Sequence, residues 1–222
     1  RDDSTHDLHQ LLFMLHGIGQ HADFVDGQFV SWDGSDGLSG GNHEFRELLE
    51  ALLSGRLREV PLWLSVLSVE WHAQLHRPEV DALLDACAPE GVPDLRGFVK
   101  DNIMDILYYS SAANSQRIVD SIAAQLNAKY RAFVDDHPGW SGRVNLLAHS
   151  LGSVIVLDML THAGRCFQSV YYPKLAFDVS CFFAIGSPAA CFLISRRANA
   201  PANAPANAHA NARPPDVAPP PP

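Results

Sequence analysis

Four short apolar runs, each separated from the next by a longer segment, limit the folds that this chain of 222 residues can adopt. None of the four contains a charged residue, which is typical of strands that are buried on both faces of a parallel sheet. The runs cover residues 11–15, 62–69, 144–148 and 180–185. Between them lie segments with helical period, at residues 42–55, 114–136 and 151–162. This alternation predicts an α/β fold, a mostly parallel sheet flanked by helices.

Composition sets the far end of the chain apart. Residues 198–222 are Ala-Asn-Ala-Pro repeats that run into polyproline, and they hold eight of the 15 prolines. Such a segment buries too little apolar surface to offset the entropy cost of ordering it. We therefore predict a folded domain over residues 1–197 and a low-complexity, disordered tail over residues 198–222.

The charge balance and the cysteines exclude several classes of protein. The formal net charge of −9 leaves no broad basic surface for nucleic acid, and no stretch approaches the roughly 18 apolar residues that span a bilayer. The four cysteines form no CxxC pair, and two of them sit inside apolar runs, where a reduced, buried thiol is expected. No secretory signal is visible, and the start at Arg1 suggests that an upstream segment was removed. We therefore expect a protein of a reducing compartment that does not bind nucleic acid.

The string Ala-His-Ser-Leu-Gly at residues 148–152 lies between a predicted strand and a predicted helix. A turn of this kind projects its central serine beyond the sheet edge and aims the N-terminus of the next helix at it. The flanking residues must be small because neighbouring backbone comes close. Gly152 meets this need on one side, whereas Ala148 replaces the first glycine of the GxSxG pattern. Ser150 is therefore the candidate nucleophile.

A glycine-containing loop, His-Gly-Ile-Gly at residues 16–19, follows the first apolar run. A serine that attacks an acyl carbonyl needs two hydrogen-bond donors for the oxyanion that forms. The backbone N–H of Leu151 is one natural donor. Gly17 and Ile18 are the candidates for the second, because glycines let the backbone approach a substrate closely. Taken alone, this loop could equally be a tight turn, but its place ahead of the serine motif favours the oxyanion role.

These two motifs, with three further segments, resemble those of the DDHD-domain intracellular phospholipase A1 family, which includes phosphatidic-acid-preferring enzymes. The matching segments are residues 16–20, 69–76, 105–109, 149–153 and 183–188. The resemblance covers almost everything before the tail and places Ser150 at the nucleophile of that family. It implies an α/β-hydrolase-like fold that is C-terminally incomplete here, hydrolysis of a fatty acyl ester of a glycerophospholipid, and a cytoplasmic protein acting peripherally on organelle membranes.

The residues that would activate Ser150 cannot be identified in the sequence. Hydrolases of this type use a histidine to take the serine proton and a carboxylate to orient that histidine, in the chain order serine, acid, histidine. Asp158 and His162 fall about 12 Å and about 18 Å along the helix after the serine, too far for contact, and Asp178 precedes the last strand. We interpret His149 as a packing residue, because adjacent side chains in such a turn diverge. In the family, the DDHD domain is proposed to supply the acid and the histidine, and in this chain the proline-rich tail follows instead.

Two weaker patterns, one for a zinc pair and one for a calcium loop, are incomplete in this sequence. His72 and His76 have the spacing of a zinc pair on a helix, but Ala73 stands where the HExxH pattern requires glutamate. The aspartates of the loop at residues 20–41 miss the EF-hand spacing, because Gly37 stands where a third ligand should be. We therefore predict no metal and no cofactor, and we interpret the loop as a cover for the active site.

Aromatic residues occur in that loop and before the long helix. Two roles stay open for those of the loop, contact with lipid chains or packing back as a small cluster. They are Phe24, Phe29 and Trp32. Residues 107–109, Leu-Tyr-Tyr, are expected in the core.

Two hypotheses of different classes follow. The first is a serine esterase that forms an acyl-enzyme on Ser150, acts on phospholipid at a membrane surface and needs residues absent from this chain. The second is a catalytically inactive, truncated fragment that acts, if at all, as a binding module. The segment at residues 69–76 disfavours a third reading, another lipase-like or thioesterase-like hydrolase. If strands after Phe183 are missing, one sheet edge is open, so a homo-oligomer is also expected.

Overall fold

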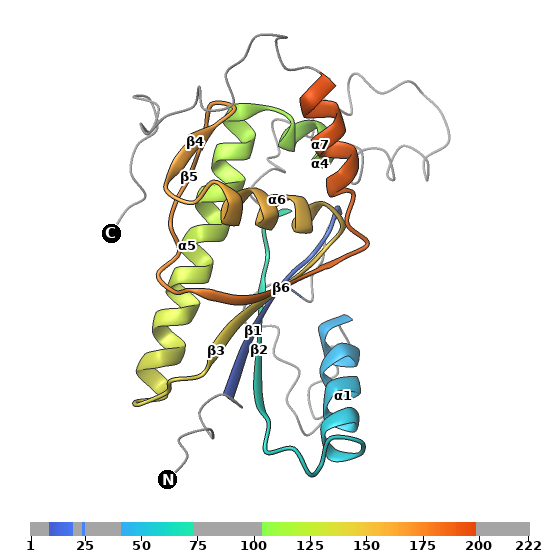
Figure 1. Ribbon diagram of the computed structural model, residues 1–222, viewed down its shortest axis with the longest axis vertical. Coiled ribbons are helices and arrows are strands. Elements are labelled where there is room, and N and C mark those ends of the chain that lie inside the picture. The colour runs from blue at the N-terminus through green and yellow to red at the C-terminus, as the bar shows by residue number, and fades with distance from the viewer. Residues whose placement is uncertain (1–8, 20–23, 25–40, 73–103, 199–222) are drawn as a thin grey trace.

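The computed structural model describes residues 9–19, 24, 41–72 and 104–198. Helices and strands alternate along them, with the strands gathered at the centre (Figure 1). In chain order the elements are β1 (His9–Leu15), α1 (Gly41–Ser54), β2 (Trp63–Val69), α4 (Met104–Tyr109), α5 (Ala112–Asp136), β3 (Arg143–His149), α6 (Ser150–Thr161), β4 (Arg165–Phe167), β5 (Val170–Tyr172), β6 (Val179–Ile185) and α7 (Ala189–Ala198). The four predicted strands and three predicted helices are all present, with bounds within two residues of those expected.

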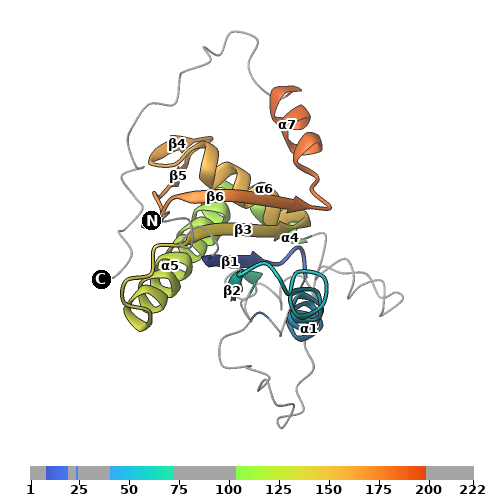
Figure 2. The same cartoon turned by 60° about the horizontal axis from the view of Figure 1, so that its bottom comes forward.

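The central sheet has the strand order β2-β1-β3-β6, and every neighbouring pair is parallel. Leu15 pairs with Val69 on one side and with Ala148 on the other, and His149 pairs with Ile185. The carboxyl ends of all four strands therefore meet at one edge, where open parallel sheets bind their ligands. Figure 2 shows the four strands side by side, with α1 near the β2 end. The predicted α/β fold with a mostly parallel sheet is confirmed.

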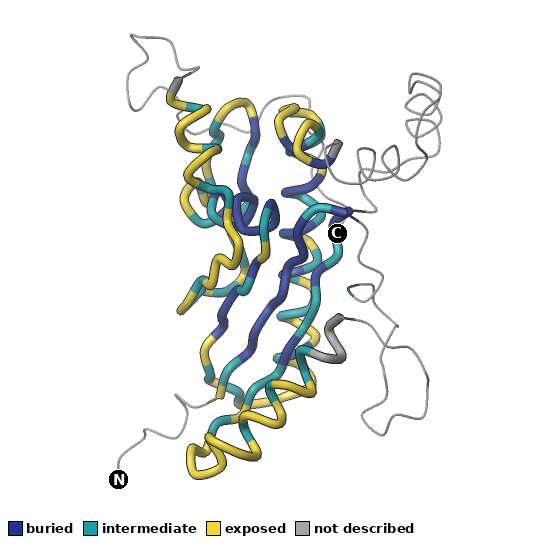
Figure 3. The backbone as a smooth tube through the Cα atoms, turned by 90° about the vertical axis from the view of Figure 1, so that its right-hand side faces the viewer, coloured by how far each residue is buried: buried dark blue, intermediate teal, exposed yellow. Residues whose placement is uncertain are grey.

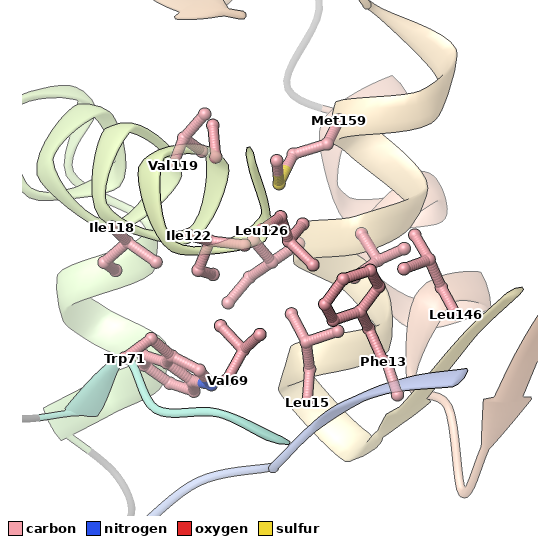
Figure 4. Packing of buried hydrophobic residues seen from close by; sticks show 14 of the residues in the cluster. Phe13, Leu15, Val69, Trp71, Ile118, Val119, Ile122, Leu126, Leu146 and Met159 are labelled. Carbon is pink, nitrogen blue, oxygen red and sulfur yellow. The ribbon is translucent and has the colours of Figure 1, made fainter. Parts of the chain in front are cut away.

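One face of the sheet carries the main hydrophobic core. Alternate residues of β1 point to this face, where α5 and α6 cover them. Figure 4 shows Ile122 and Leu126 of α5 against Leu15 and Val69 of the sheet. All four of these side chains are at most 1% exposed. Because burial of one such side chain contributes about 1.5–3 kcal/mol, this cluster holds the edge of the sheet where the candidate site lies.

The opposite face is covered by α1. Leu12, Met14 and Val66 are buried there, and Phe45 and Leu49 of α1 pack against them. Arg46 also donates a hydrogen bond from Nη2 to the Val66 carbonyl at 2.8 Å. Partial burial lowers the pKa of this guanidinium. The predicted apolar stripe of this helix is thus only partly buried, because Leu48 is 60% and Leu52 39% exposed.

Three parts of the fold were not predicted. Two are too short to show a period in sequence, the helix α4 and the antiparallel hairpin of β4 and β5. Gln116 of α5 holds this hairpin with two hydrogen bonds to the Tyr171 backbone, 2.9 Å to its carbonyl and 2.7 Å from its N–H. The third is α7, which continues through Ala198, the first residue assigned to the tail. Residues 199–222, predicted to be disordered, lie outside the described residues.

Two predictions about burial are partly or wholly wrong. Tyr109 is buried and Tyr108 packs against the core as expected, but Leu107 is 55% exposed on α4. Cys181 and Cys191, the cysteines within apolar runs, are exposed because β6 and α7 are themselves uncovered. Cys166, in β4, is half-buried.

β6 is the outer strand of the described sheet and has no strand beyond it. Phe183 is 51% and Ile185 49% exposed, whereas Val179 and Phe182 of the same strand pack against the main core. The inner strands are mostly buried along their length, as Figure 3 shows. Among the helices that the structure describes, none has the length and apolar character needed to cross a membrane.

Candidate active site at the carboxyl edge of the sheet

Ser150 stands at the junction of β3 and α6, half-buried, with a backbone φ of +48°. A residue with a side chain adopts this left-handed conformation rarely, because its Cβ crowds the backbone. The strain arises because the chain turns sharply from strand into helix, the geometry that exposes a nucleophile above a sheet. Leu151, the predicted first oxyanion donor, follows in the first turn of α6 with its side chain 1% exposed.

The glycine loop after β1 lies directly against this turn. A Cβ added to Gly17 would sit 2.9 Å from Cβ of Ser150 and 3.0 Å from Nδ1 of His149. On the other side of the turn, a Cβ added to Gly152 would collide with the carbonyl oxygen of His16. The predicted contact between the loop and the serine turn is therefore present, and small residues are needed on both sides of it. Ile18, the other predicted donor, is half-buried and packs against the main core.

His16 fixes the beginning of the loop. It is 2% exposed, and its ring stacks on the indole of Trp71 with 5.1 Å between centroids and 2° between planes. The Trp71 backbone N–H donates to His16 Nε2 at 3.1 Å, and Trp71 Nε1 donates to the His16 carbonyl at 3.1 Å. Glu70 Oε1 lies 3.7 Å from the same Nε2. The residues that follow β2, Glu70 and Trp71, thus fix the position of His16, which follows β1.

Asp105 of α4 fixes the end of the loop. Its side chain is fully buried, and Oδ2 accepts a hydrogen bond from the Gly19 N–H at 2.8 Å. Oδ1 lies 3.7 Å from Nε2 of His72, which is also buried. Sequence reasoning assigned Asp105 no role. The only signal in the sequence was an aspartate beside apolar residues in a segment that resembles the family.

The residues after β6 complete the edge. Gly186 has a φ of +55°, and a Cβ added to it would lie 3.2 Å from Nε2 of His149. The His149 side chain thus lies between this glycine and Gly17, but it is exposed, contrary to its interpretation as a packing residue. Ser187 Oγ lies 2.7 Å from Ser153 Oγ, which also hydrogen-bonds to the Ser150 carbonyl. All three predicted motifs therefore meet at Ser150.

Asp158, His162 and Asp178, which were considered for a triad, lie away from Ser150, as expected. Asp158 is buried and accepts hydrogen bonds from Tyr109 Oη at 2.6 Å and from Arg196 at 2.7 and 2.6 Å. His162 stacks on Phe167, with 3.9 Å between ring centroids. Asp178 is exposed and precedes β6, at the opposite edge of the sheet. Within the described ranges, no side chain forms a hydrogen bond with the Ser150 hydroxyl.

Burial dominates the titration behaviour around Asp158. It raises the pKa of Tyr109 well above its ordinary value, and the nearby Asp158 carboxylate raises it further. The same two causes raise the pKa of Tyr172 to about 12. Burial lowers the pKa of His162, with Arg196 and Arg165 acting in the same direction and Asp158 opposing them. This cluster is a structural anchor between α6, α4 and α7.

Two of the weaker signals fall largely outside the described residues. His76 and most of the loop at residues 20–41 lie there, so neither the zinc pair nor the cover is tested. Phe24 is described, and it packs against the second core cluster and edge-on to His16, with 5.2 Å between ring centroids. This favours packing over lipid contact for Phe24. The part of the chain that the structure describes holds no group of three or more potential metal ligands.

Comparison with known proteins identifies relatives among lipid hydrolases. The chain is 33% identical over 155 residues to triacylglycerol hydrolase DDHD2 of Homo sapiens, a match covering 68% of this chain and 21% of that protein. It is 31% identical over 155 residues to phospholipase SGR2 of Arabidopsis thaliana, covering 68% and 15%, and 28% identical over 178 residues to intracellular phospholipase A1 of Caenorhabditis elegans, covering 80% and 19%. The match thus spans about a fifth of the length of these relatives or less. No protein-family model and no solved structure matches the chain.

Proposed function

Because this chain belongs to the family of DDHD-type intracellular phospholipases, we propose that it forms the nucleophile and oxyanion part of a serine hydrolase acting on a fatty acyl ester of a glycerophospholipid, such as phosphatidic acid. The names of its relatives support ester hydrolysis on glycerolipids, since one is a triacylglycerol hydrolase and another a phospholipase A1. We further propose that it meets this substrate at a membrane surface, on the cytoplasmic side.

The geometry of Ser150 carries this proposal. Ser150 has a φ of +48° at the start of α6, at the carboxyl edge of the sheet, and a Cβ added to Gly17 would lie 2.9 Å from its Cβ. In the first step Ser150 Oγ attacks the acyl carbonyl carbon, and the carbonyl oxygen becomes an oxyanion. Backbone N–H groups of Leu151 and of Gly17 or Ile18 would stabilise that charge, with the N-terminus of α6 adding its dipole.

The remaining steps need a base. The Ser150 proton must pass to a base and then to the leaving alcohol oxygen, which departs with the lysophospholipid as the acyl-enzyme forms. Water then attacks the acyl carbonyl, gives its proton to the same base, and releases the fatty acid and free Ser150. Among the described residues, no side chain forms a hydrogen bond with the Ser150 hydroxyl. We therefore propose that the base comes from outside the described residues.

Covalent labelling by a fluorophosphonate probe tests the proposal, because the probe reacts with activated serines. We expect the folded chain to be labelled and Ser150→Ala to remain unlabelled. Ser110→Ala, which removes an exposed hydroxyl at the end of α4, is the matched control and should label as the unaltered chain does. Labelling that persists in Ser150→Ala would place the reactive serine elsewhere and overturn the assignment.

A second candidate function, a binding module without catalysis, is favoured by one observation. The Ser150 hydroxyl has no described histidine to accept its proton. On this reading, the chain stays unlabelled while circular dichroism shows it folded. Flotation with phosphatidic-acid vesicles, compared with neutral vesicles, would then measure lipid binding, and Ser150→Ala should bind as well as the unaltered chain.

A further inference from the structure

Asp105 is a carboxylate with no exposed surface, and the buried His72 lies beside it. Burial of an ionised carboxylate is costly unless hydrogen bonds and charges compensate it. The Gly19 N–H donates a compensating hydrogen bond to Oδ2 at 2.8 Å, and His72 Nε2 lies 3.7 Å from Oδ1. A residue this costly to bury, bonded to a loop 86 positions away, contributes more than packing.

The loop that Asp105 holds is fixed at both ends. His16 is stacked on Trp71 and bonded to its backbone, which sets the first residue of the loop. Asp105 sets the last residue, Gly19, whose φ is +86°. Between these two points only Gly17 and Ile18 remain, and Gly17 lies beside Ser150. Their N–H groups are therefore placed by the two flanking contacts.

Asp105 is itself held by a rigid support. The helix α4 that carries it ends at Tyr109, whose hydroxyl donates to Asp158 of α6 at 2.6 Å. The Tyr109 carbonyl accepts a hydrogen bond from Ser115 Oγ of α5. Both residues are buried, so the helix has little freedom to move. The position of the Gly19 N–H is thus tied to the two helices that cover the main core.

We propose that Asp105 is a positioning residue for the oxyanion site. An ionised carboxylate only accepts hydrogen bonds, so it cannot bind an oxyanion directly and acts through Gly19. By holding the Gly19 N–H it keeps the backbone of Gly17 and Ile18 aimed at the place where the charge develops next to Ser150. Preorganisation of this kind lowers the barrier because the donors need no rearrangement during the reaction. The inference rests on the proposed function for its catalytic consequence, whereas the hold on the loop is independent of it.

Two variants separate the hydrogen bond from the charge. Asp105→Ala removes the acceptor, whereas Asp105→Asn keeps an oxygen that can still accept from Gly19. Asn145→Ala is the matched control, because Asn145 is a buried polar residue of similar size, bonded to Gln10 at 2.7 Å in the middle of the sheet. It loses a buried hydrogen bond without touching the loop.

Amide hydrogen exchange at Gly19, measured by NMR, reports whether the Gly19 N–H stays hydrogen-bonded. This measurement does not depend on the reactivity of Ser150. We expect the exchange rate at Gly19 to rise at least about 10-fold in Asp105→Ala. In Asp105→Asn the rate should return close to that of the unaltered chain, and in Asn145→Ala it should not change. Unchanged exchange at Gly19 in Asp105→Ala would overturn the inference. If Asp105→Ala does not fold, Asp105→Leu, which is of similar size and has no acceptor, takes its place with the same two outcomes.

Ester hydrolysis or probe labelling measures the effect of Asp105 on catalysis. In Asp105→Ala, kcat or the labelling rate should fall about 10- to 100-fold with KM little changed, because the oxyanion exists only in the transition state. A change in KM alone, with kcat unaltered, would contradict a positioning role. An equal fall of kcat in Asn145→Ala would contradict it as well. If the unaltered chain neither hydrolyses nor labels, the proposed function fails, and the exchange at Gly19 alone decides whether Asp105 holds the loop.

Discussion

Gly152 lies so close to His16 that a methyl group on it would collide with the His16 carbonyl oxygen. The obstacle is backbone, and the same His16 is fixed by Trp71 on its other side. We therefore expect Gly152→Ala to lower the free energy of unfolding by about 1–3 kcal/mol, the usual cost of overpacking. Urea denaturation measures this. A loss below about 0.5 kcal/mol would show that the loop moves away freely.

Gly17→Ala should separate reactivity from stability. The added methyl group would meet side chains, Cβ of Ser150 at 2.9 Å and Nδ1 of His149 at 3.0 Å. Since His149 is exposed, its ring can turn away, whereas Ser150 is held by its strained backbone. We expect a smaller loss of stability than in Gly152→Ala, together with at least a 10-fold slower reaction with the fluorophosphonate probe. Unchanged labelling would mean that Gly17 does not lie beside the reactive serine.

Arg196 anchors α7, and its loss should destabilise the fold. Its guanidinium forms a bidentate ion pair with Asp158, at 2.7 and 2.6 Å, and its side chain is 18% exposed. Arg196→Ala leaves the Asp158 carboxylate buried with less compensation, so we expect a loss of about 1–3 kcal/mol in the free energy of unfolding. Arg197→Ala, in the same turn but exposed, should cost less than about 0.5 kcal/mol. Equal losses would contradict the anchoring role.

His162 makes stability depend on pH. Burial against Phe167 lowers its pKa below 6.5, so the folded state favours the neutral ring more than the unfolded chain does. Below about pH 6.5 the unfolded state binds the extra proton first, and stability decreases as the pH falls. His162→Phe keeps a ring that can stack and removes the proton site. Its melting temperature should therefore fall less between pH 7 and pH 5 than that of the unaltered chain, and equal falls would refute this.

The strands and long helices could be predicted from sequence because their signal is local. Charge-free runs and a 3.6-residue period need only neighbouring residues to be read. The support of the site could not be predicted, because it consists of contacts between distant residues. Asp105 reaches Gly19 across 86 positions, and Arg196 reaches Asp158 across 38. A buried carboxylate inside an apolar segment resembles any surface aspartate until its partners are known.

The same limit explains the errors in burial. The apolar run of β6 predicts a buried strand, and the apolar residues around Cys191 predict a buried thiol. Whether these residues are exposed depends on what lies beside them rather than on their own sequence. Cys181 and Cys191 were expected in the core for this reason, and both are exposed. Ser150 is the opposite case, since a short string between a strand and a helix carried enough local information to place it at the strained turn.

The uncovered β6 strand predicts self-association. It presents unpaired backbone groups along the outer edge of the described sheet, beside Phe183 and Ile185, each about half exposed. Exposed apolar edges pair with other chains, and lysine on such an edge prevents the pairing. We expect size-exclusion chromatography with light scattering to give a mass that rises with protein concentration, and Phe183→Lys to reduce it. Leu48→Lys, a control on the far face where Leu48 is 60% exposed, should leave the association unchanged. A sharp monomer at all concentrations, with cooperative melting, would contradict this, because an edge that stays unpaired at high concentration has no tendency to recruit a second chain.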